Sequence, residues 1–156
     1  MTEADISKVK ALLGFELEQV WGAVHFFDGQ LSEGPPLFVW LKFREAPALQ
    51  LSGSPDGATL VVGDKAPEPV DMGEAGEILI RDLSKTPPFD QALGNRLQAI
   101  WTIRSVEFST TVGIRLGFGG FVAPVIGNFD DELFVATNVP VDVDAGELVE
   151  DLVGGG

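Results

Sequence analysis

His25 is the only histidine of the 156-residue chain, so any reaction that needs an imidazole general base must use it. A Ser-His-Asp arrangement would also need an exposed nucleophile, and the sequence has no G-x-S-x-G turn of the kind that presents one in many hydrolases. His25 also lies between apolar residues of a predicted strand. We therefore expect no catalytic residue. His25 remains a candidate binding residue, and the alternative is an ordinary packed or surface position.

A second group of chemically useful side chains is the acidic run Asp130, Asp131 and Glu132, which follows Asn128. Their oxygens could bind a hard cation, but the run lacks the spaced acidic ladder, central glycine and terminal glutamate of a calcium loop. Asp and Asn are also common in hairpin turns without any ion. The sequence therefore predicts no metal site, and the three acidic residues stay candidates for contact with a partner.

The glycine-rich run at residues 117–121 superficially resembles a phosphate-binding loop. A dinucleotide-binding fingerprint needs a helix directly after its glycines, whereas here another apolar strand follows. Because the chain has no cysteine, thiolate catalysis, disulfides and cysteine-ligated metal centres are excluded as well. We expect a tight hairpin at Gly119 and Gly120, and no cofactor.

Trp40 and Phe38 share one face of a predicted strand at residues 37–43, opposite the more regular apolar face. Arg115 takes the place of Trp40 in the second half of the chain, according to the internal repeat described below. These three side chains are the candidates for lining a pocket or interface between the halves. The alternative is that they form a second packed layer.

The elements that position these side chains are mostly strands, and we expect an α+β fold dominated by antiparallel β-structure. Thr2 and Asp5 form a helix-capping pair, apolar residues follow at helical spacing, and Gly14 can end the helix. A strand then follows at residues 15–27, with Leu17 and Trp21 on one face. Further strands are predicted at residues 37–43, 48–52, 59–62, 77–83, 96–105, 112–118, 121–126 and 132–135, with a helical turn at 89–93, a loop at 64–76 and a short helix at 147–153.

The two halves of the chain share four short patterns in the same order. Residues 13–21 match 93–101, 41–43 match 116–118, 60–62 match 133–135, and 69–77 match 140–147. This collinearity predicts a duplication, with repeats at about residues 9–83 and 89–153 packed about a pseudo-two-fold axis. Trp21 and Trp101 would then be core anchors. We expect a single domain over residues 1–153 and a disordered tail at 154–156. A functional site is expected where the copies differ, as at His25 and its counterpart Ser105.

The formal net charge is −14, and its distribution is uneven. No lysine or arginine follows Arg115, whereas eight acidic residues do. Such a field repels nucleic-acid phosphates and anionic lipid and attracts a basic protein. We therefore expect no nucleic-acid or membrane partner, but a basic protein partner or a homodimer. The alternative is that the acidic residues only keep the protein dispersed.

The first residues are acidic and lack the basic region and apolar run of a secretory signal. No stretch approaches the ~18 consecutive apolar residues of a membrane-spanning helix. We expect a soluble protein of the cytoplasm.

Residues 113–135, preceded by Leu93, Gly94, Leu97, Ile100 and Trp101, form a strand-turn-strand pattern. This third of the chain resembles small uncharacterised bacterial proteins, some of which look like immunity partners of toxins. The resemblance carries over no catalytic residues, and it implies a bacterial, non-enzymatic binding role.

Together these observations favour a non-enzymatic bacterial binding or interaction protein with an acidic face and an unknown partner. The alternative is a small-molecule-binding protein or a hydrolase with a pocket between the two repeats.

Overall fold

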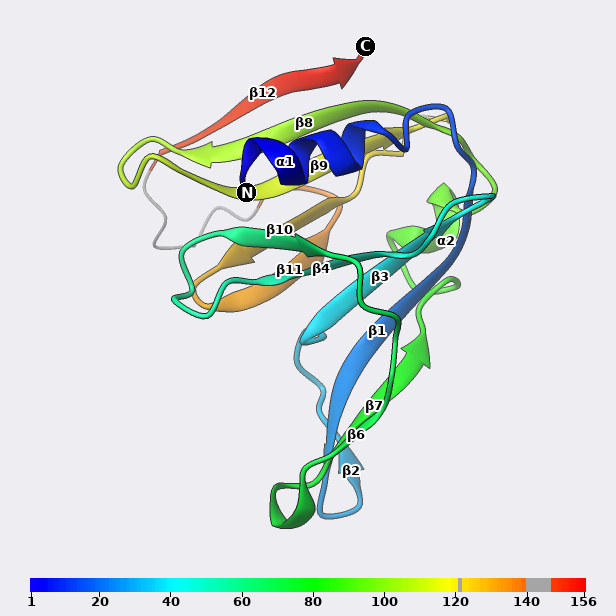
Figure 1. Ribbon diagram of the computed structural model, residues 1–156, viewed down its shortest axis with the longest axis vertical. Helices are drawn as coiled ribbons and strands as arrows, with labels where there is room; N and C mark the ends of the chain where they lie inside the picture. Colours follow the sequence, from blue (N-terminus) through cyan, green and yellow to red (C-terminus); the bar gives the residue numbers. More distant parts are fainter. Residues whose placement is uncertain (121, 140–146) are drawn as a thin grey trace.

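Two antiparallel sheets form most of the protein, as the computed structural model shows for residues 1–120, 122–139 and 147–156 (Figure 1). From edge to edge, the first sheet contains β5 (Leu60–Gly63), β4 (Leu49–Gly53), β3 (Phe38–Phe43), β1 (Leu17–Phe27), β7 (Glu77–Asp82) and β6 (Val70–Asp71), and β2 (Gln30–Leu31) pairs with β1. The second contains β11 (Glu132–Ala136), β10 (Val125–Phe129), β9 (Thr110–Phe118), β8 (Leu97–Ser105) and β12 (Leu148–Gly155). The helices are α1 (Glu3–Lys10), α2 (Phe89–Ala92) and the 3-10 turn η1 (Gly73–Ala75). The expected mostly-β, antiparallel architecture is confirmed.

Helix α1 begins and ends as its sequence predicts. The Thr2 hydroxyl accepts a hydrogen bond from the Asp5 backbone N–H at 3.1 Å, and the Asp5 carboxylate accepts one from the Thr2 N–H at 3.2 Å. This capping box satisfies N–H groups that have no partner within the helix. After the helix, Gly14 adopts a φ of +86°, a conformation that glycine takes at little cost. Val9 is buried and attaches the helix to the core.

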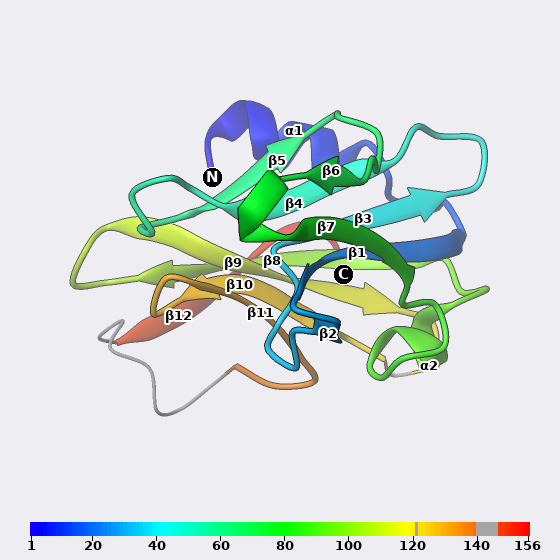
Figure 2. The ribbon, with the colours of Figure 1, turned by 90° about the horizontal axis from the view of Figure 1, so that it is seen from below.

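The main hydrophobic core lies between the two sheets (Figure 2). The ring of Phe43 from the first sheet stacks on Phe118 from the second, with 6.3 Å between ring centroids. Helices α1 and α2 close the core through Val9 and Phe89. The outer face of each sheet carries a smaller apolar cluster of its own, so both sheets are packed on two sides. This explains why β3 is apolar at every position except Lys42.

The two sheets have the same neighbour order and corresponding registers. Strands β5-β4-β3-β1-β7 correspond in order to β11-β10-β9-β8-β12. Trp21 lies opposite Trp40 in the first sheet, and Trp101 lies opposite Arg115 in the second. Where the sheets meet, the Gly14 N–H donates to Leu97 O at 2.7 Å and the Gly94 N–H donates to Leu17 O at 2.8 Å. Glu16 and Arg96 form an isolated antiparallel bridge at the same place.

A register irregularity near the start of β1 changes which residues of this strand face the core. The pairing of β1 with β3 shifts between Leu17 and Gln19, so Val20 rather than Trp21 follows Leu17 into the core. Trp21 packs partly buried against the outer cluster of the first sheet. The pairing of β8 with β9 shifts in the same way after Leu97. The prediction that the tryptophans anchor the central core is therefore wrong, because a bulge reverses the alternation of faces.

Between β9 and β10 the chain reverses at Gly119 and Gly120, as predicted, but β10 lies further along the chain than the strand predicted at 121–126. The Phe118 N–H donates to Val122 O at 2.7 Å and the Leu116 N–H donates to Pro124 O at 3.0 Å, so the chain pairs on both sides of the glycines, and β10 runs from Val125 to Phe129. Residue 121 of the predicted hairpin lies outside the described residues. The next turn is centred on Asp130 and Asp131, which have φ of 52° and 62°. Asp tolerates this left-handed conformation better than most residues.

The C-terminal segment is a strand, and the short helix predicted at residues 147–153 is wrong. β12 pairs with β8 from Leu148 opposite Ser105 to Gly155 opposite Ala99. Its apolar residues have a spacing that suits a helix, but so short a helix is marginal in water, whereas pairing with the free edge of β8 provides hydrogen-bond partners for the backbone of both strands. Gly154 and Gly155, which the sequence placed in a disordered tail, belong to this strand.

Candidate functional site

The first sheet extends into an arm that projects from the body of the molecule (Figure 1). We define the arm as residues 24–34 and 68–80, which include the distal end of β1, β2, β6, η1 and most of β7. The β1–β2 turn at Asp28 and Gly29 has φ of 51° and 75°, as the favoured two-residue hairpin turns require. The sequence predicted strands for residues 24–27 and 77–80 of the arm, but loops for residues 28–34 and 68–76, where glycine, proline and serine separate the apolar residues.

Large apolar side chains are exposed on the arm. Eight are exposed in the described part of the chain, and four of these belong to the arm. They are Phe27 (53% exposed), Val70 (50%), Leu31 (38%) and Met72 (38%). Isolated exposed apolar residues are ordinary, but a gathered set marks a contact surface.

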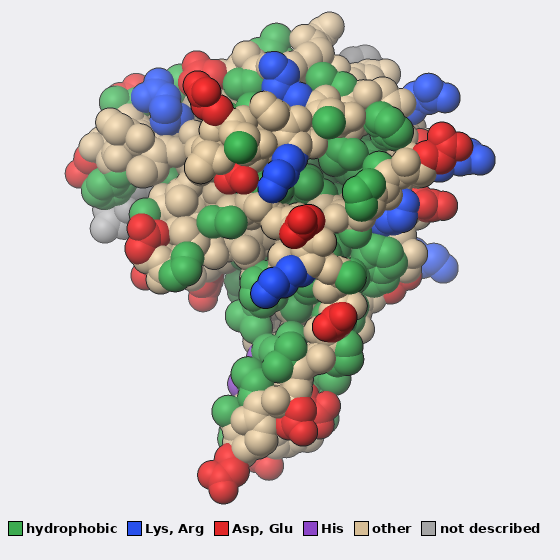
Figure 3. Space-filling view, in the orientation of Figure 1, with side chains coloured by type: hydrophobic (Ala, Val, Ile, Leu, Met, Phe, Trp, Pro, Cys, Tyr) green, Lys and Arg blue, Asp and Glu red, His purple; other side chains and the backbone are tan. Residues whose placement is uncertain are grey.

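The arm is also strongly acidic. It contains six carboxylates and no lysine or arginine; the carboxylates are Asp28, Glu33, Glu68, Asp71, Glu74 and Glu77. None of the six forms an ion pair within the described residues. Acidic and apolar side chains are visible together at its distal end (Figure 3). The arm therefore combines unneutralised negative charge with exposed apolar area.

His25 lies on the arm, where it connects β1 to η1 through a hydrogen bond. Its Nε2 lies 2.7 Å from Ala75 O, and because a carbonyl only accepts, the imidazole must donate. The ring stacks on Phe27 with 6.2 Å between centroids. Gly76, directly after η1, lies so close to β1 that a Cβ on it would be 2.3 Å from Phe26 O. His25 thus fastens η1 onto β1, and among the described residues no serine or carboxylate is hydrogen-bonded to it.

Phe38 and Trp40 line a groove on the outer face of the same sheet. The groove has a volume of about 690 Å³, and Val70 and Ile78 at the base of the arm also line it. The Trp40 indole N–H donates to Lys65 O at 2.7 Å, which holds the following loop over the sheet. His25 shares this face, since it is two residues beyond Ala23 in β1. The structure thus brings Phe38, Trp40 and His25 onto one face.

Arg115 lies on the outer face of the other sheet and does not line that groove. Its guanidinium donates to Glu150 at 2.8 Å, to Ala123 O at 3.1 Å and to Thr137 O at 3.2 Å. A second arginine, Arg104, lies 3.7 Å from Asp151. Two of the eight acidic residues that follow Arg115 are thus engaged by arginines of their own sheet, and Asp142 and Asp144 lie outside the described residues.

Asp130, Asp131 and Glu132 lie at the β10–β11 turn, apart from the groove. This turn is beside the β4–β5 turn, where the Asn128 side chain donates to Thr59 O at 3.0 Å. Within residues 1–120, 122–139 and 147–156, no group of three or more His, Asp or Glu side chains is arranged to hold a metal ion.

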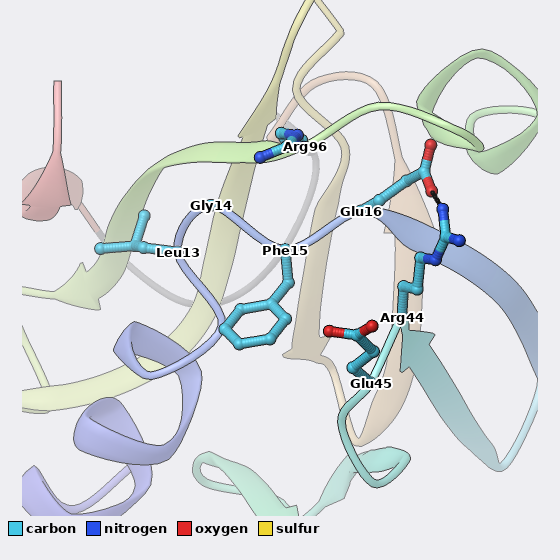
Figure 4. A pocket seen from close by; sticks show the side chains of 7 residues that line it. All are labelled: Leu13, Gly14, Phe15, Glu16, Arg44, Glu45 and Arg96. Carbon is cyan, nitrogen blue, oxygen red and sulfur yellow. Dashed lines mark ion pairs between the residues drawn. The ribbon is translucent and has the colours of Figure 1, made fainter.

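A polar pocket lies where the two sheets meet, and the sequence did not indicate it (Figure 4). It has a volume of about 460 Å³ and is lined by Leu13, Gly14, Phe15, Glu16, Arg44, Glu45 and Arg96. Glu16 and Arg44 form an ion pair of 3.6 Å on its wall. Both side chains are well exposed, so water screens the pair and it adds little stability.

A second unforeseen hollow, which we call the inter-sheet cleft, lies between the first sheet, α2 and β11. Its volume is about 500 Å³. Its lining residues are Val24, Leu31, Ser32, Glu33, Gly34, Pro36, Arg81, Leu83, Thr86, Pro87, Phe89 and Val135. Residues from both halves of the chain meet there.

Comparison with models of protein families, with curated proteins and with solved structures finds no match. Among the described residues, no helix is both long and apolar enough to cross a membrane.

Proposed function

We propose that this is a non-enzymatic binding protein whose arm docks onto a basic partner protein. The observation that carries the proposal is the composition of the arm, which combines six carboxylates, none of them ion-paired within the described residues, with four exposed apolar side chains and no lysine or arginine. The groove beside Trp40 continues this surface through Val70 and Ile78. The second-half carboxylates, by contrast, are partly neutralised by Arg104 and Arg115.

The two kinds of side chain would contribute differently. The carboxylates attract a positively charged partner over a distance and favour a fast encounter, an effect that salt weakens within a Debye length of about 8 Å at 0.15 M ionic strength. The apolar side chains hold the complex after contact, because burying them removes apolar area from water. Binding should therefore be sensitive to salt in its association rate and to Phe27 or Met72 in its lifetime.

We also propose that the chain is an internal duplication about a pseudo-two-fold axis through the bridge of Glu16 and Arg96. Its support is the common strand order of the sheets, the corresponding registers and the reciprocal hydrogen bonds of Gly14 and Gly94. The equivalent side chains Trp40 and Arg115 each donate to the loop that follows the outer strands of their sheet, at Lys65 O and Thr137 O. On this proposal the arm is an elaboration of one copy.

The test compares two matched variants of the full chain. The arm variant carries Phe27→Ser and Met72→Ser, and the control carries Val106→Ser and Phe108→Ser, two exposed residues of the β8–β9 hairpin. Each immobilised protein is exposed to native lysate at low and high salt. We expect a protein of basic surface to bind the unaltered chain and the control, to be lost from the arm variant, and to elute with salt.

Capture of the same proteins by both variants, or the absence of any salt-sensitive partner, would contradict the proposal. Size-exclusion chromatography of the unaltered chain shows whether the protein is a monomer or a homodimer. A dimer that the arm variant breaks would make a second copy, rather than a basic protein, the occupant of this surface.

A further inference from the structure

The inter-sheet cleft lies at the base of the arm, which contributes Val24 and residues 31–34 to its lining, and has the properties of a small-ligand site. Its volume of about 500 Å³ falls within the range of known ligand pockets, roughly 300–1,000 Å³. Val24 and Phe89 on its walls are 7% and 2% exposed, and Val135 from the second sheet is half-buried. The interior surface is thus apolar and supplied by three different elements.

One cation lies in the lining of this cleft. Arg81 is opposite Gly22 in the pairing of β7 with β1, and its guanidinium has no ion pair or hydrogen bond within the described residues. Guanidinium binds carboxylates with two parallel hydrogen bonds, which makes it selective for that group. The hydroxyls of Ser32 and Thr86 also line the cleft and can donate to an anion. Glu33 in the same lining disfavours a ligand with more than one negative charge.

The floor of the cleft is shaped by close packing on a glycine. A Cβ on Gly22 would lie 2.5 Å from Leu83 Cδ1 and 3.3 Å from Pro36 Cβ. Without that atom, Leu83 and Pro36 approach the strand directly. The corresponding part of the second sheet is filled differently, because there the last residue of α1 and the segment after it pack onto β12, with Leu13 Cδ1 3.0 Å and Lys10 Cγ 3.4 Å from the Cβ position of Gly154. The α2 helix has four residues against the eight of α1, so it leaves this space open.

We propose that the inter-sheet cleft binds an amphipathic monocarboxylate, with its carboxylate on Arg81 and its apolar part against Val24, Phe89 and Val135. The net charge of −14 opposes any anion at long range, but at physiological salt that field is screened beyond about 8 Å, whereas contact with Arg81 is not. The site does not depend on the arm proposal.

The probe is octanoate below its micellar concentration, with octylamine and octanol as ligands of the same length and different charge. Binding is followed by calorimetry and by amide chemical shifts in the full chain. We expect octanoate to bind more tightly than either control ligand and to shift the signals of Val24, Phe89 and Val135. Equal or weaker binding of octanoate than of octanol, or shifts that are confined to residues 25–30 and 68–80, which do not line the cleft, would overturn the proposal.

Two variants test whether Arg81 is the residue that binds the ligand carboxylate. Arg81→Gln should weaken octanoate binding about tenfold while leaving octanol unchanged, since it removes one charge-assisted contact. Arg96→Gln, which alters an arginine of the polar pocket outside the cleft, should leave both unchanged. The arm variant with Phe27→Ser and Met72→Ser should still bind octanoate, so failure of the arm proposal leaves this result intact. Octanoate affinity that is unaffected by Arg81→Gln would contradict the assignment.

Discussion

The two sheets of this protein share a frame and differ in what is attached to it. Strand order and register correspond from β5 to β7 and from β11 to β12. The first sheet continues into the arm and leaves a cleft beside a one-turn helix, whereas the second ends in a short β8–β9 hairpin and is covered at β12 by Lys10 and Leu13. The common parts are those that bury the core. The arm and the inter-sheet cleft lie where the sheets differ, whereas the polar pocket lies at their common junction beside Glu16 and Arg96.

The largest expected effect comes from the pair that joins the sheets. Phe43 and Phe118 occupy corresponding positions, are 0% and 4% exposed, and stack on each other. Phe43→Ala and Phe118→Ala should each reduce the free energy of unfolding by about 3–5 kcal/mol, as large-to-small core changes do. Urea unfolding measures both. The exposed Phe108 serves as the control, and Phe108→Ala should change the free energy of unfolding by less than about 0.5 kcal/mol.

If the sheets are equivalent, the two core variants should lose similar stability. Because the rings touch, the double variant should lose less than the sum of the single losses by about 0.5–1.5 kcal/mol. A loss below about 1 kcal/mol at one position and a full loss at the other would break the comparison, because it would mean that one sheet contributes little to the shared core.

A smaller effect is expected at the outer faces, where Trp40 and Arg115 hold corresponding loops. Arg115→Met removes the Glu150 ion pair and two carbonyl contacts, and since both side chains are partly exposed we expect a loss of about 1–2 kcal/mol. Trp40→Phe removes one hydrogen bond to Lys65 O and should cost about 1 kcal/mol or less. Hydrogen exchange should show faster opening of β12 in the first variant and of the 64–68 loop in the second. Unchanged exchange in both would show that these side chains do not hold the loops.

Much of the common frame could be predicted from the sequence, and the attachments could not. The capping box at Thr2 and Asp5 and the three strands β3, β4 and β5 follow from local patterns, and both predictions are confirmed. The bulge after Leu17 could not be foreseen, because it depends on pairing with β3. The same holds for β12, whose residues suit a helix until β8 offers its edge.

The candidate site was predicted only in part, for a geometric reason. Phe38, Trp40 and His25 share one face because they belong to adjacent strands with matched alternation. Arg115 was grouped with them by its repeat position, but the sheets pack with their inner faces together, so corresponding outer positions lie on opposite sides of the sandwich. The arm was missed because Phe27, Val70 and Met72 stand next to turn residues, and their exposure follows from the projection of the sheet rather than from any local pattern.

The smallest effect concerns acid sensitivity at the end of β7, where the first sheet has a titrating group and the second does not. Asp82 lies opposite Trp21, and the residue opposite Trp101 is Leu152. Hydrogen bonding by the Ser84 side chain, and next by its backbone N–H at 2.8 Å, holds the pKa of Asp82 below its usual value of 3.8. A carboxylate with a lowered folded-state pKa contributes stability above its unfolded pKa and loses it as the pH falls through the folded value.

The Asp82 contribution should therefore be complete at neutral pH, begin to fall near pH 4 and disappear as the pH drops through the lower folded-state pKa. Because the side chain is almost fully exposed, water screens its interactions and the effect should be slight. Asp82→Asn should flatten the acid limb of the unfolding free energy against pH, and Leu152→Ala should shift the whole curve without changing its shape. The comparison requires that buried Ser84 keeps its position in Asp82→Asn. Its hydroxyl accepts from the Val20 N–H at 2.9 Å, so an unchanged amide shift of Val20 would verify that position. An acid limb that is as steep in Asp82→Asn as in the unaltered chain would mean that other carboxylates set the acid response of the first sheet.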